Sequence, residues 1–266
     1  MRIFLCWIFL FLIMNTLPAI NPVREYKMTP DKVGLEYTEQ KITTSDGYDL
    51  NSWWMEPEPA NRQAKTIVIA YGDGGNMGFV LAYAMGLVRN GYTVLTFDYR
   101  GFGHSDDFEI DRDYYYYNEF ATDLVTAIKW AKQQKRDHEV GVLAFSMGTA
   151  MATLSYEQEP FHFLIGEGVV YDAVENVERI KKMKERDLIL PEGAGQLKEK
   201  AQEVNIPVLF FASQSDKITS LEDTKQWVGG RENGQIIEYD GAHLSGAATL
   251  GLGAYIDTIH TWLKDE

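Results

Sequence analysis

Cysteine is almost absent from this sequence: Cys6 is the single one among 266 residues, and it lies in an apolar segment at the N-terminus. The rest of the chain therefore has no thiol for catalysis and no means of forming a disulfide. Histidine is scarce as well, and no group of Cys and His residues has the spacing of metal ligands. The sequence contains neither a phosphate-binding P-loop nor an internal repeat. We therefore expect no metal and no cofactor.

Positive charge is in the minority. The 25 Lys and Arg residues stand against 39 Asp and Glu residues, which gives a formal net charge of -14 at pH 7. Nucleic acids and anionic membrane surfaces are poor partners for so acidic a chain, whereas small neutral or cationic molecules are suitable substrates. A hydrophobic fraction of 45% is sufficient for a large core, and the length favours one large domain.

The N-terminus has the pattern of a targeting segment. Arg2 follows the initial Met, residues 3–14 form an unbroken apolar run, and small residues follow. Twelve apolar residues are fewer than the ~20 that a membrane span needs, so we expect residues 1–20 to be a signal peptide, cut after Ala19, or a retained anchor. The protein is then exported to the periplasm or secreted, with a membrane as partner only if the segment is retained.

The remaining chain alternates between strand and helix patterns. Two runs on either side of an Asp46-Gly47 turn signal predict an antiparallel hairpin, and later apolar runs predict further strands and helices. The hairpin covers 35–42 and 48–55, the later strands cover 65–71, 92–99, 140–145, 163–171, 207–212 and 235–239, and the helices lie near 79–89, 120–131, 221–228 and 252–263.

This order predicts an α/β fold with a mostly parallel sheet of about eight strands, an N-terminal antiparallel hairpin and helices on both faces. Residues 172–205 interrupt the alternation, and we interpret them as a short cap insertion. Residues 21–32 are polar and are expected to form an extended leader. We assign residues 21–266 to a single domain.

The most informative stretch is E-V-G-V-L-A-F-S-M-G-T-A at residues 139–150. A buried strand ends at Ser146 and a helix begins directly after it. Ala144 and Gly148 leave room for a sharp turn, which resembles the nucleophile elbow of the α/β-hydrolases, usually G-x-S-x-G. The alternative is a serine that merely caps a helix after a buried strand.

A nucleophilic serine needs a histidine base and a carboxylate that orients it, and the α/β-hydrolase order is Ser, Asp or Glu, then His. His243 directly follows the last strand and is the expected base, whereas His260 falls in the final helix, where a surface role is expected. Two aspartates follow late strands. By the resemblance, Asp216 is the preferred acid and Asp172 the alternative.

A second resemblance narrows the family. Residues 98–105, D-Y-R-G-F-G-H-S, match the D-Y-R-G-x-G-x-S turn of small serine hydrolases whose oxyanion loop is H-G-N-x-G-N. The corresponding loop here is Y-G-D-G-G-N, so Tyr71 replaces His and Asp73 replaces Asn. The resemblance extends over about residues 33–264 and implies that the backbone N–H groups of Met147 and Asp73 form the oxyanion hole. An inward carboxylate at Asp73 would oppose the oxyanion, so we expect it to turn towards the Gly74-Gly75 amides or Arg100.

These features together predict a serine hydrolase that forms an acyl-enzyme, most simply a carboxylesterase for small or medium acyl esters. A serine peptidase or amide hydrolase is the enzymatic alternative, and a catalytically silent binding protein on the same fold is the other. The expected substrate is a small ester or amide. Four consecutive tyrosines at 114–117 either line the entrance or pack their rings against the domain.

Overall fold

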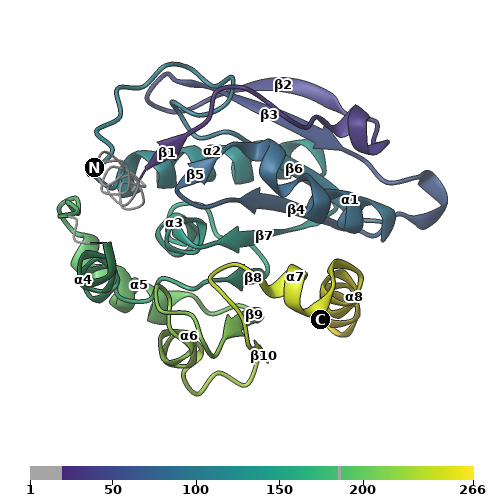
Figure 1. Ribbon diagram of the computed structural model, residues 1–266. Coiled ribbons are helices and arrows are strands. Elements are labelled where there is room, and N and C mark those ends of the chain that lie inside the picture. Colours follow the sequence, from purple (N-terminus) through teal and green to yellow (C-terminus); the bar gives the residue numbers. More distant parts are fainter. Residues whose placement is uncertain (1–19, 185–186) are drawn as a thin grey trace, which may run out of the picture.

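The computed structural model describes residues 20–184 and 187–266, which form an α/β arrangement around one large sheet (Figure 1). The expected targeting segment, its cleavage site at Ala19 and Cys6 lie outside the described residues. In the part of the chain that is described, no helix is both long enough and apolar enough to cross a membrane.

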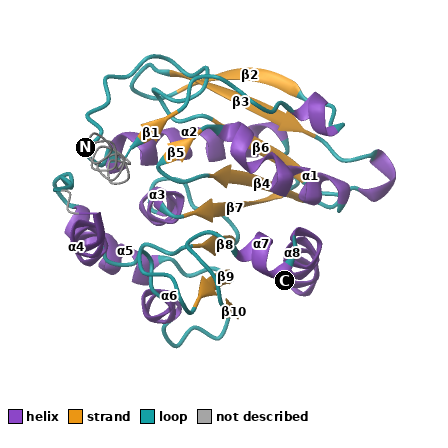
Figure 2. Cartoon of the chain, in the orientation of Figure 1, coloured by secondary structure: helices purple, strands orange, loops and turns teal. Residues whose placement is uncertain are grey.

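Strands and helices alternate along the chain (Figure 2). The strands are β1 (Asn21–Pro22), β2 (Thr38–Thr43), β3 (Asp49–Met55), β4 (Lys65–Ala70), β5 (Gly74–Gly75), β6 (Thr93–Phe97), β7 (Glu139–Phe145), β8 (Leu164–Glu167), β9 (Val208–Ser213) and β10 (Gly234–Tyr239). The α-helices are α1 (Leu81–Arg89), α2 (Tyr117–Gln134), α3 (Met147–Tyr156), α4 (Ala173–Lys184), α5 (Leu197–Glu203), α6 (Leu221–Val228), α7 (Gly246–Leu250) and α8 (Leu252–Asp265). Short 3₁₀ helices cover Pro30–Val33, Pro59–Asn61, Met77–Val80 and Ala194–Gln196.

The large sheet has the order β10-β9-β8-β7-β4-β6-β3-β2. The strands from β10 to β6 are parallel to their neighbours, and β3 is antiparallel to both β6 and β2. The predicted mixed, mostly parallel sheet of about eight strands with an N-terminal hairpin is therefore confirmed.

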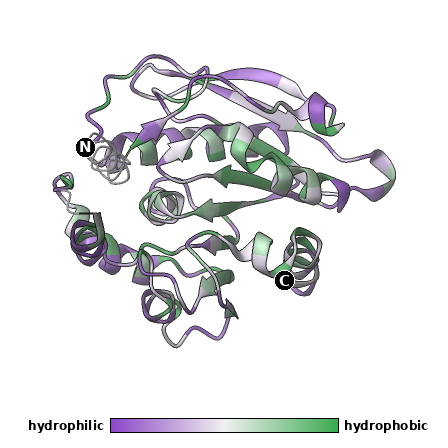
Figure 3. Ribbon diagram, viewed as in Figure 1, coloured by the Kyte–Doolittle hydropathy of each residue, from purple (hydrophilic) through white to green (hydrophobic). Residues whose placement is uncertain are grey.

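The central strands are apolar because helices cover both sides of them (Figure 3). Helices α1 and α8 pack together on one face, while α2, α3, α5 and α6 form a contiguous layer on the other. The helix α2 turns an apolar stripe inward that includes Phe120, Leu124 and Ile128, all buried at 0% exposure. This 3.6-residue periodicity is what the sequence indicated.

Three local expectations differ from the structure. The strand expected at 163–171 ends at Glu167, because Gly168 has φ 70° and turns the chain out of the sheet. The helix expected from residue 79 begins as the 3₁₀ turn Met77–Val80 before α1. The expected leader contains β1, which pairs in parallel with β5, and the 3₁₀ turn Pro30–Val33.

The sheet has its topological switch point at β4. The chain passes from β4 to β6 on one side and then to β7 on the other. Loops that follow β4 and β7 therefore diverge and leave room between them at the carboxyl edge of the sheet. The chain enters α4 from the same edge, after β8 (Figure 1).

Candidate active site

Ser146 stands at a strained turn between β7 and α3. Its backbone has φ 50° and ψ -120°, which non-glycine residues seldom adopt. A Cβ at Gly148 would lie 2.1 Å from the Ala70 carbonyl oxygen, so this position must be glycine. Ala144 is fully buried opposite Ala70 and Gly166 on the neighbouring strands. Because those neighbours are small, the alanine that departs from G-x-S-x-G is accommodated.

The structure brings Ser146 and His243 together. The Ser146 hydroxyl oxygen lies 3.0 Å from His243 Nε2, and His243 Nδ1 lies 2.7 Å from Asp216 Oδ2. Ser146 retains 8% exposure, while the His243 side chain retains 22% and that of Asp216 only 3%. The three side chains thus form a continuous hydrogen-bonded chain in which His243 is the most exposed member and Asp216 the most buried.

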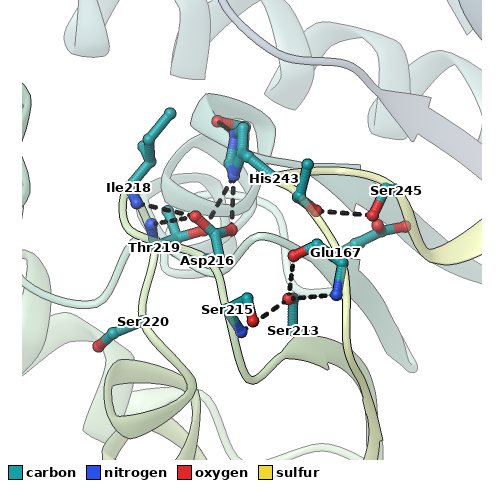
Figure 4. A network of polar contacts seen from close by, with 12 residues as sticks. Glu167, Ser213, Ser215, Asp216, Ile218, Thr219, Ser220, His243 and Ser245 are labelled. Carbon is teal, nitrogen blue, oxygen red and sulfur yellow. Dashed lines mark hydrogen bonds and ion pairs between the residues drawn. The ribbon is translucent and has the colours of Figure 1, made fainter. Parts of the chain in front are cut away.

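The Asp216 carboxylate is surrounded by donors (Figure 4). Its Oδ1 accepts hydrogen bonds from the backbone N–H groups of Ile218 and Thr219, at 2.8 and 3.1 Å, and its Oδ2 accepts one from the Thr219 hydroxyl at 2.8 Å. Burial acts to raise the pKa of Asp216, but the hydrogen bond and charge of His243, together with these donors, hold it below its ordinary value. Asp216 is therefore an ionised partner for a histidine.

The two alternatives from the sequence lie elsewhere. Asp172 accepts the backbone N–H groups of Val174 and Glu175 at the start of α4 and pairs with Lys198 at 3.1 Å. It acts as a helix cap, in agreement with its position before α4. His260 lies on α8, where its Nδ1 is 2.9 Å from the Tyr92 hydroxyl.

Sequence reasoning missed a buried glutamate that holds the histidine loop. Glu167 is fully buried, and its Oε1 accepts hydrogen bonds from the Tyr239 hydroxyl and the Gly246 N–H, both at 2.7 Å. These two residues stand at the two ends of the loop that carries His243. The Glu167 carbonyl also accepts the Ser146 N–H at 2.9 Å. The available signal was a carboxylate inside an otherwise apolar strand, which is rarely buried without partners.

Two further contacts fix the same loop. The Ser213 hydroxyl donates to the Gly241 carbonyl and accepts the N–H groups of Gly241 and Ser215, which ties the Asp216 loop to the His243 loop (Figure 4). A Cβ at Gly168 would lie 2.9 Å from His243 Cε1, so glycine is needed beside the imidazole. Thr219 and Ser213 are common turn residues, and nothing in their local sequence distinguished them.

The loop expected to hold the oxyanion lies beside the serine. A Cβ at Gly72 would be 3.5 Å from Ser146 Cβ. Met147 is the first residue of α3, so its N–H has no acceptor within the helix. The loop and the N-terminus of the helix therefore both lie beside the serine. Tyr71, which replaces the histidine of the usual loop, has a structural contact: its buried hydroxyl donates to Asp98 Oδ1 at 3.0 Å.

Asp73 lies near two buried tyrosines. Burial raises the pKa values of Tyr115 and Tyr117, and the negative charge of Asp73 raises both further. Arg100, one of the expected partners of Asp73, is directed instead to Asp46 and Asp123. Two members of the tyrosine run therefore pack into the domain next to the oxyanion loop.

A metal site requires several ligating side chains that lie close together. Over residues 20–184 and 187–266, His, Cys, Asp and Glu side chains do not gather in any group of three that could hold a metal ion. The chemistry that these side chains can support is proton transfer between a hydroxyl, an imidazole and a carboxylate.

Comparisons with known proteins give matches over parts of the chain. The family model described as serine aminopeptidase, S33 matches residues 61–181. Among curated proteins, the chain is 28% identical over 141 residues to the lysophosphatidylserine lipase ABHD12 of Mus musculus, covering 51% of this chain and 33% of that protein. It is 36% identical over 78 residues to the uncharacterized protein YfhR of Escherichia coli K12, covering 29% of this chain and 27% of that protein. The matched stretches thus span about a third or less of these relatives.

The fold has a close counterpart among solved structures. The esterase Pf2001 of Pyrococcus furiosus superposes with a TM-score of 0.75 at 20% identity, covering 94% of this chain and 99% of that structure. Such a likeness establishes the fold, and the elbow at Ser146 and the turn at 98–105 supply the sequence features that accompany it. The chain therefore has the α/β-hydrolase fold, and residues 61–181 resemble the serine aminopeptidase family within it.

Proposed function

We propose that the protein is a serine hydrolase that acts through a Ser146-His243-Asp216 triad. The observation that carries this proposal is the unbroken hydrogen-bonded chain of these side chains, with the serine on a strained turn. Strain of this kind persists only where the surrounding structure enforces it, and it is concentrated at functional sites. A serine that only capped a helix would need neither the strained backbone nor the imidazole.

The proposed reaction uses these three side chains in the usual order of a serine hydrolase. The Ser146 oxygen attacks the acyl carbon while His243 Nε2 takes the hydroxyl proton, and Asp216 stabilises the imidazolium. The backbone N–H groups of Met147 and Asp73 then donate to the tetrahedral oxyanion. The bond to the leaving group breaks as His243 returns the proton to it. A water molecule attacks the acyl-enzyme with His243 again as base, which releases the acid and restores the serine.

The substrate that we favour is a carboxylic ester with a small or medium acyl group. Support comes from the names of two similar proteins, one a structural neighbour described as an esterase and the other a curated protein described as a lipase. The family description as an aminopeptidase favours a second candidate, hydrolysis of an amide or peptide bond at the same serine. Both reactions use one acyl-enzyme and differ in the leaving group.

A fluorophosphonate probe, which reacts with activated serines, tests the proposal. The wild-type protein should be labelled, and Ser146→Ala should not. Ser155→Ala is a matched control, because this buried hydroxyl lies on the same helix and donates to the Met151 carbonyl. Labelling of Ser146→Ala would contradict the assignment, and a wild type that binds esters without labelling would identify a binding protein. Esters of increasing acyl length and aminoacyl anilides then separate the two hydrolase candidates.

We also propose that the protein is exported to the periplasm or secreted, on the basis of the pattern in residues 1–20. A signal peptide would leave a shorter mature chain, and a retained segment would hold the domain at a membrane. Cell fractionation, with mass measurement of the N-terminus, distinguishes these outcomes. Recovery of the full-length chain in the cytoplasm would contradict export.

A further inference from the structure

A short segment before the hairpin lies directly on the oxyanion loop. We call residues 20–26 the N-terminal strap. The Asn21 N–H donates to the Asp73 carbonyl at 2.8 Å, and the Val23 N–H donates to the Gly75 carbonyl at 2.8 Å. These bonds are the pairing of β1 with β5, which Figure 1 shows at the carboxyl edge of the sheet. The strap is therefore bonded to the backbone of the residues that are expected to bind the oxyanion.

The end of the loop returns bonds to the strap. Asn76 is fully buried, and its Nδ2 donates to the carbonyls of Val23 and Glu25 at 3.0 and 2.9 Å. Its Oδ1 accepts the Gly78 N–H at 3.1 Å and so caps the 3₁₀ turn that follows. One side chain thus joins the strap, the loop and the start of the next helix.

A buried carboxylate connects the strap to both ends of the loop. The Tyr26 hydroxyl donates to Asp98 Oδ2 and accepts the His104 N–H at 3.1 Å. The other oxygen of Asp98 accepts the Tyr71 hydroxyl at 3.0 Å and the Met77 N–H at 2.7 Å. Tyr71 is the first residue of the loop, and Met77 directly follows its last residue. Asp98, which is 0% exposed, therefore receives one donor from the strap and one from each end of the loop.

The loop needs such support because of its composition. Gly72, Gly74 and Gly75 supply three of the four residues between Tyr71 and Asn76, and Gly75 has φ 90°. Glycine has wide backbone freedom, so this sequence alone does not fix the direction of its N–H groups. An oxyanion hole is effective only when its donors are already in place before the reaction.

We propose that the N-terminal strap is a positioning element of the active site, which holds the oxyanion loop through Asn21, Val23 and the Tyr26–Asp98 contact. The proposal rests on the proposed function, since it assigns the strap a role in stabilising the oxyanion. The strap acts through the loop and does not touch the substrate. It also accounts for Tyr71, whose hydroxyl completes the same carboxylate cluster.

Tyr26→Phe in the full chain tests this inference. The phenyl ring keeps the contacts with Trp53 and His104 and loses only the hydroxyl. Tyr37→Phe is the matched control, because Tyr37 packs against the same Trp53 but lies 36% exposed, away from Asp98. We expect Tyr26→Phe to lower kcat for a nitrophenyl ester by about 10- to 100-fold, with KM within about twofold, since a displaced donor affects the transition state more than substrate binding. The control should match wild type.

Hydrogen–deuterium exchange of residues 71–80 gives a readout that needs no activity. Tyr26→Phe should accelerate exchange in this stretch relative to Tyr37→Phe. Asn76→Asp should do the same, because it keeps the oxygen that caps Gly78 but replaces both donors to the strap. Unchanged exchange and unchanged kcat in both variants would overturn the role of the strap, with the triad unaffected. If the wild type is not labelled by a fluorophosphonate, the proposed function fails separately, and the exchange result alone then decides whether the strap holds the loop.

Discussion

The two sides of the candidate site are built in different ways. On the triad side, Asp216 and His243 follow strands of the central sheet, and hydrogen bonds from nearby turns complete their setting. On the oxyanion side, a glycine-rich loop is held by Asp98 and by a strap that precedes the first strand of the sheet. The groups that we propose to be reactive therefore follow strands of the large sheet, whereas part of the support of the oxyanion loop comes from a segment outside that sheet.

The buried carboxylates on the two sides, Asp216 and Asp98, have pKa values shifted in opposite directions. The hydrogen bond and charge of His243 overcome burial at Asp216 and leave its pKa lowered. At Asp98, burial dominates over the donors Tyr26, Met77 and Tyr71 and raises the pKa to about 6. A histidine partner favours the ionised form of one carboxylate, whereas hydroxyl and amide donors do not outweigh burial at the other.

The largest effect should come from the triad side. We expect Asp216→Asn to lower kcat by about 10³- to 10⁴-fold, because an amide cannot stabilise the imidazolium and favours the wrong tautomer of His243. Asp172→Asn is the matched control and should change kcat by less than about threefold, since Asp172 caps α4. Ester hydrolysis by both variants measures this. The reverse order of effects would make Asp172 the acid.

The next prediction concerns the stability of the oxyanion side. Because the folded-state pKa of Asp98 lies above the ordinary value of 3.8, the native state binds more protons than the unfolded state between about pH 4 and 6. The contribution of Asp98 is thus fully present below this window and is lost as pH rises through about 6. The free energy of unfolding of wild type, relative to Asp98→Asn, should fall by about 2 kcal/mol from pH 4 to 7.

Denaturant titrations at several pH values measure this difference. Asp46→Asn is a control for which stability should change with pH in the opposite direction. The hydrogen bond from Arg100 lowers the pKa of Asp46 to about 2. The contribution of Asp46 is present above the ordinary value of 3.8 and is lost as pH falls through about 2. A difference between wild type and Asp98→Asn that does not change with pH would mean that burial does not raise the pKa of Asp98, and one that rises with pH would mean that Asp98 is stabilised as an anion, as Asp216 is.

A smaller loss of kcat is expected when a residue that only positions the His243 loop is changed. Tyr239→Phe removes one of the two donors to Glu167 Oε1 and should lower kcat by about tenfold, because one end of the His243 loop is released. Tyr92→Phe also deletes a buried hydroxyl, which contacts His260 on α8, and should leave kcat unchanged. Equal kcat in the two variants, with equal losses of stability, would show that Glu167 only supports the fold.

The sequence was sufficient to select Ser146, His243 and Asp216 as candidates, because each is marked by residues close to it in the chain. The turn at Ser146 requires small neighbours within two residues, and His243 and Asp216 each directly follow a strand. The supports were not predictable in the same way. Tyr26 and Asp98 are 72 residues apart, and Glu167 meets Tyr239 across the same separation. Such pairs depend on tertiary packing, which single-sequence periodicity does not encode.

The length of β8 illustrates the same limit. The apolar run at 163–171 satisfied the strand pattern throughout, yet the strand ends at Glu167. Gly168 combines a positive φ with a close approach to the imidazole, where any Cβ would lie 2.9 Å from His243 Cε1. The requirement comes from a loop about 75 residues further along the chain, so hydrophobicity alone placed the end of the strand too late.

The smallest effect is expected at Asp73, where the oxyanion loop departs from the family pattern. A unit charge about 6 Å from the oxyanion would oppose it by roughly 2–3 kcal/mol at an effective dielectric of about 20. One oxyanion donor contributes about 2.7–4 kcal/mol, so an inward carboxylate would cancel most of that contribution. The carboxylate lies near enough to the buried Tyr115 and Tyr117 to raise the pKa values of both, and we expect it to be turned away from the oxyanion.

Asp73→Asn should therefore keep kcat within about tenfold of wild type, equivalent to roughly 1.4 kcal/mol. The backbone N–H is retained, and the side chain changes only in charge. A gain well above tenfold would show that the carboxylate faces the oxyanion and restrains the wild-type enzyme. A collapse of kcat, with hydrogen exchange in residues 71–80 unchanged, would mean that the Asp73 carboxylate takes part in the reaction, so that the oxyanion side would contribute chemistry as well as position.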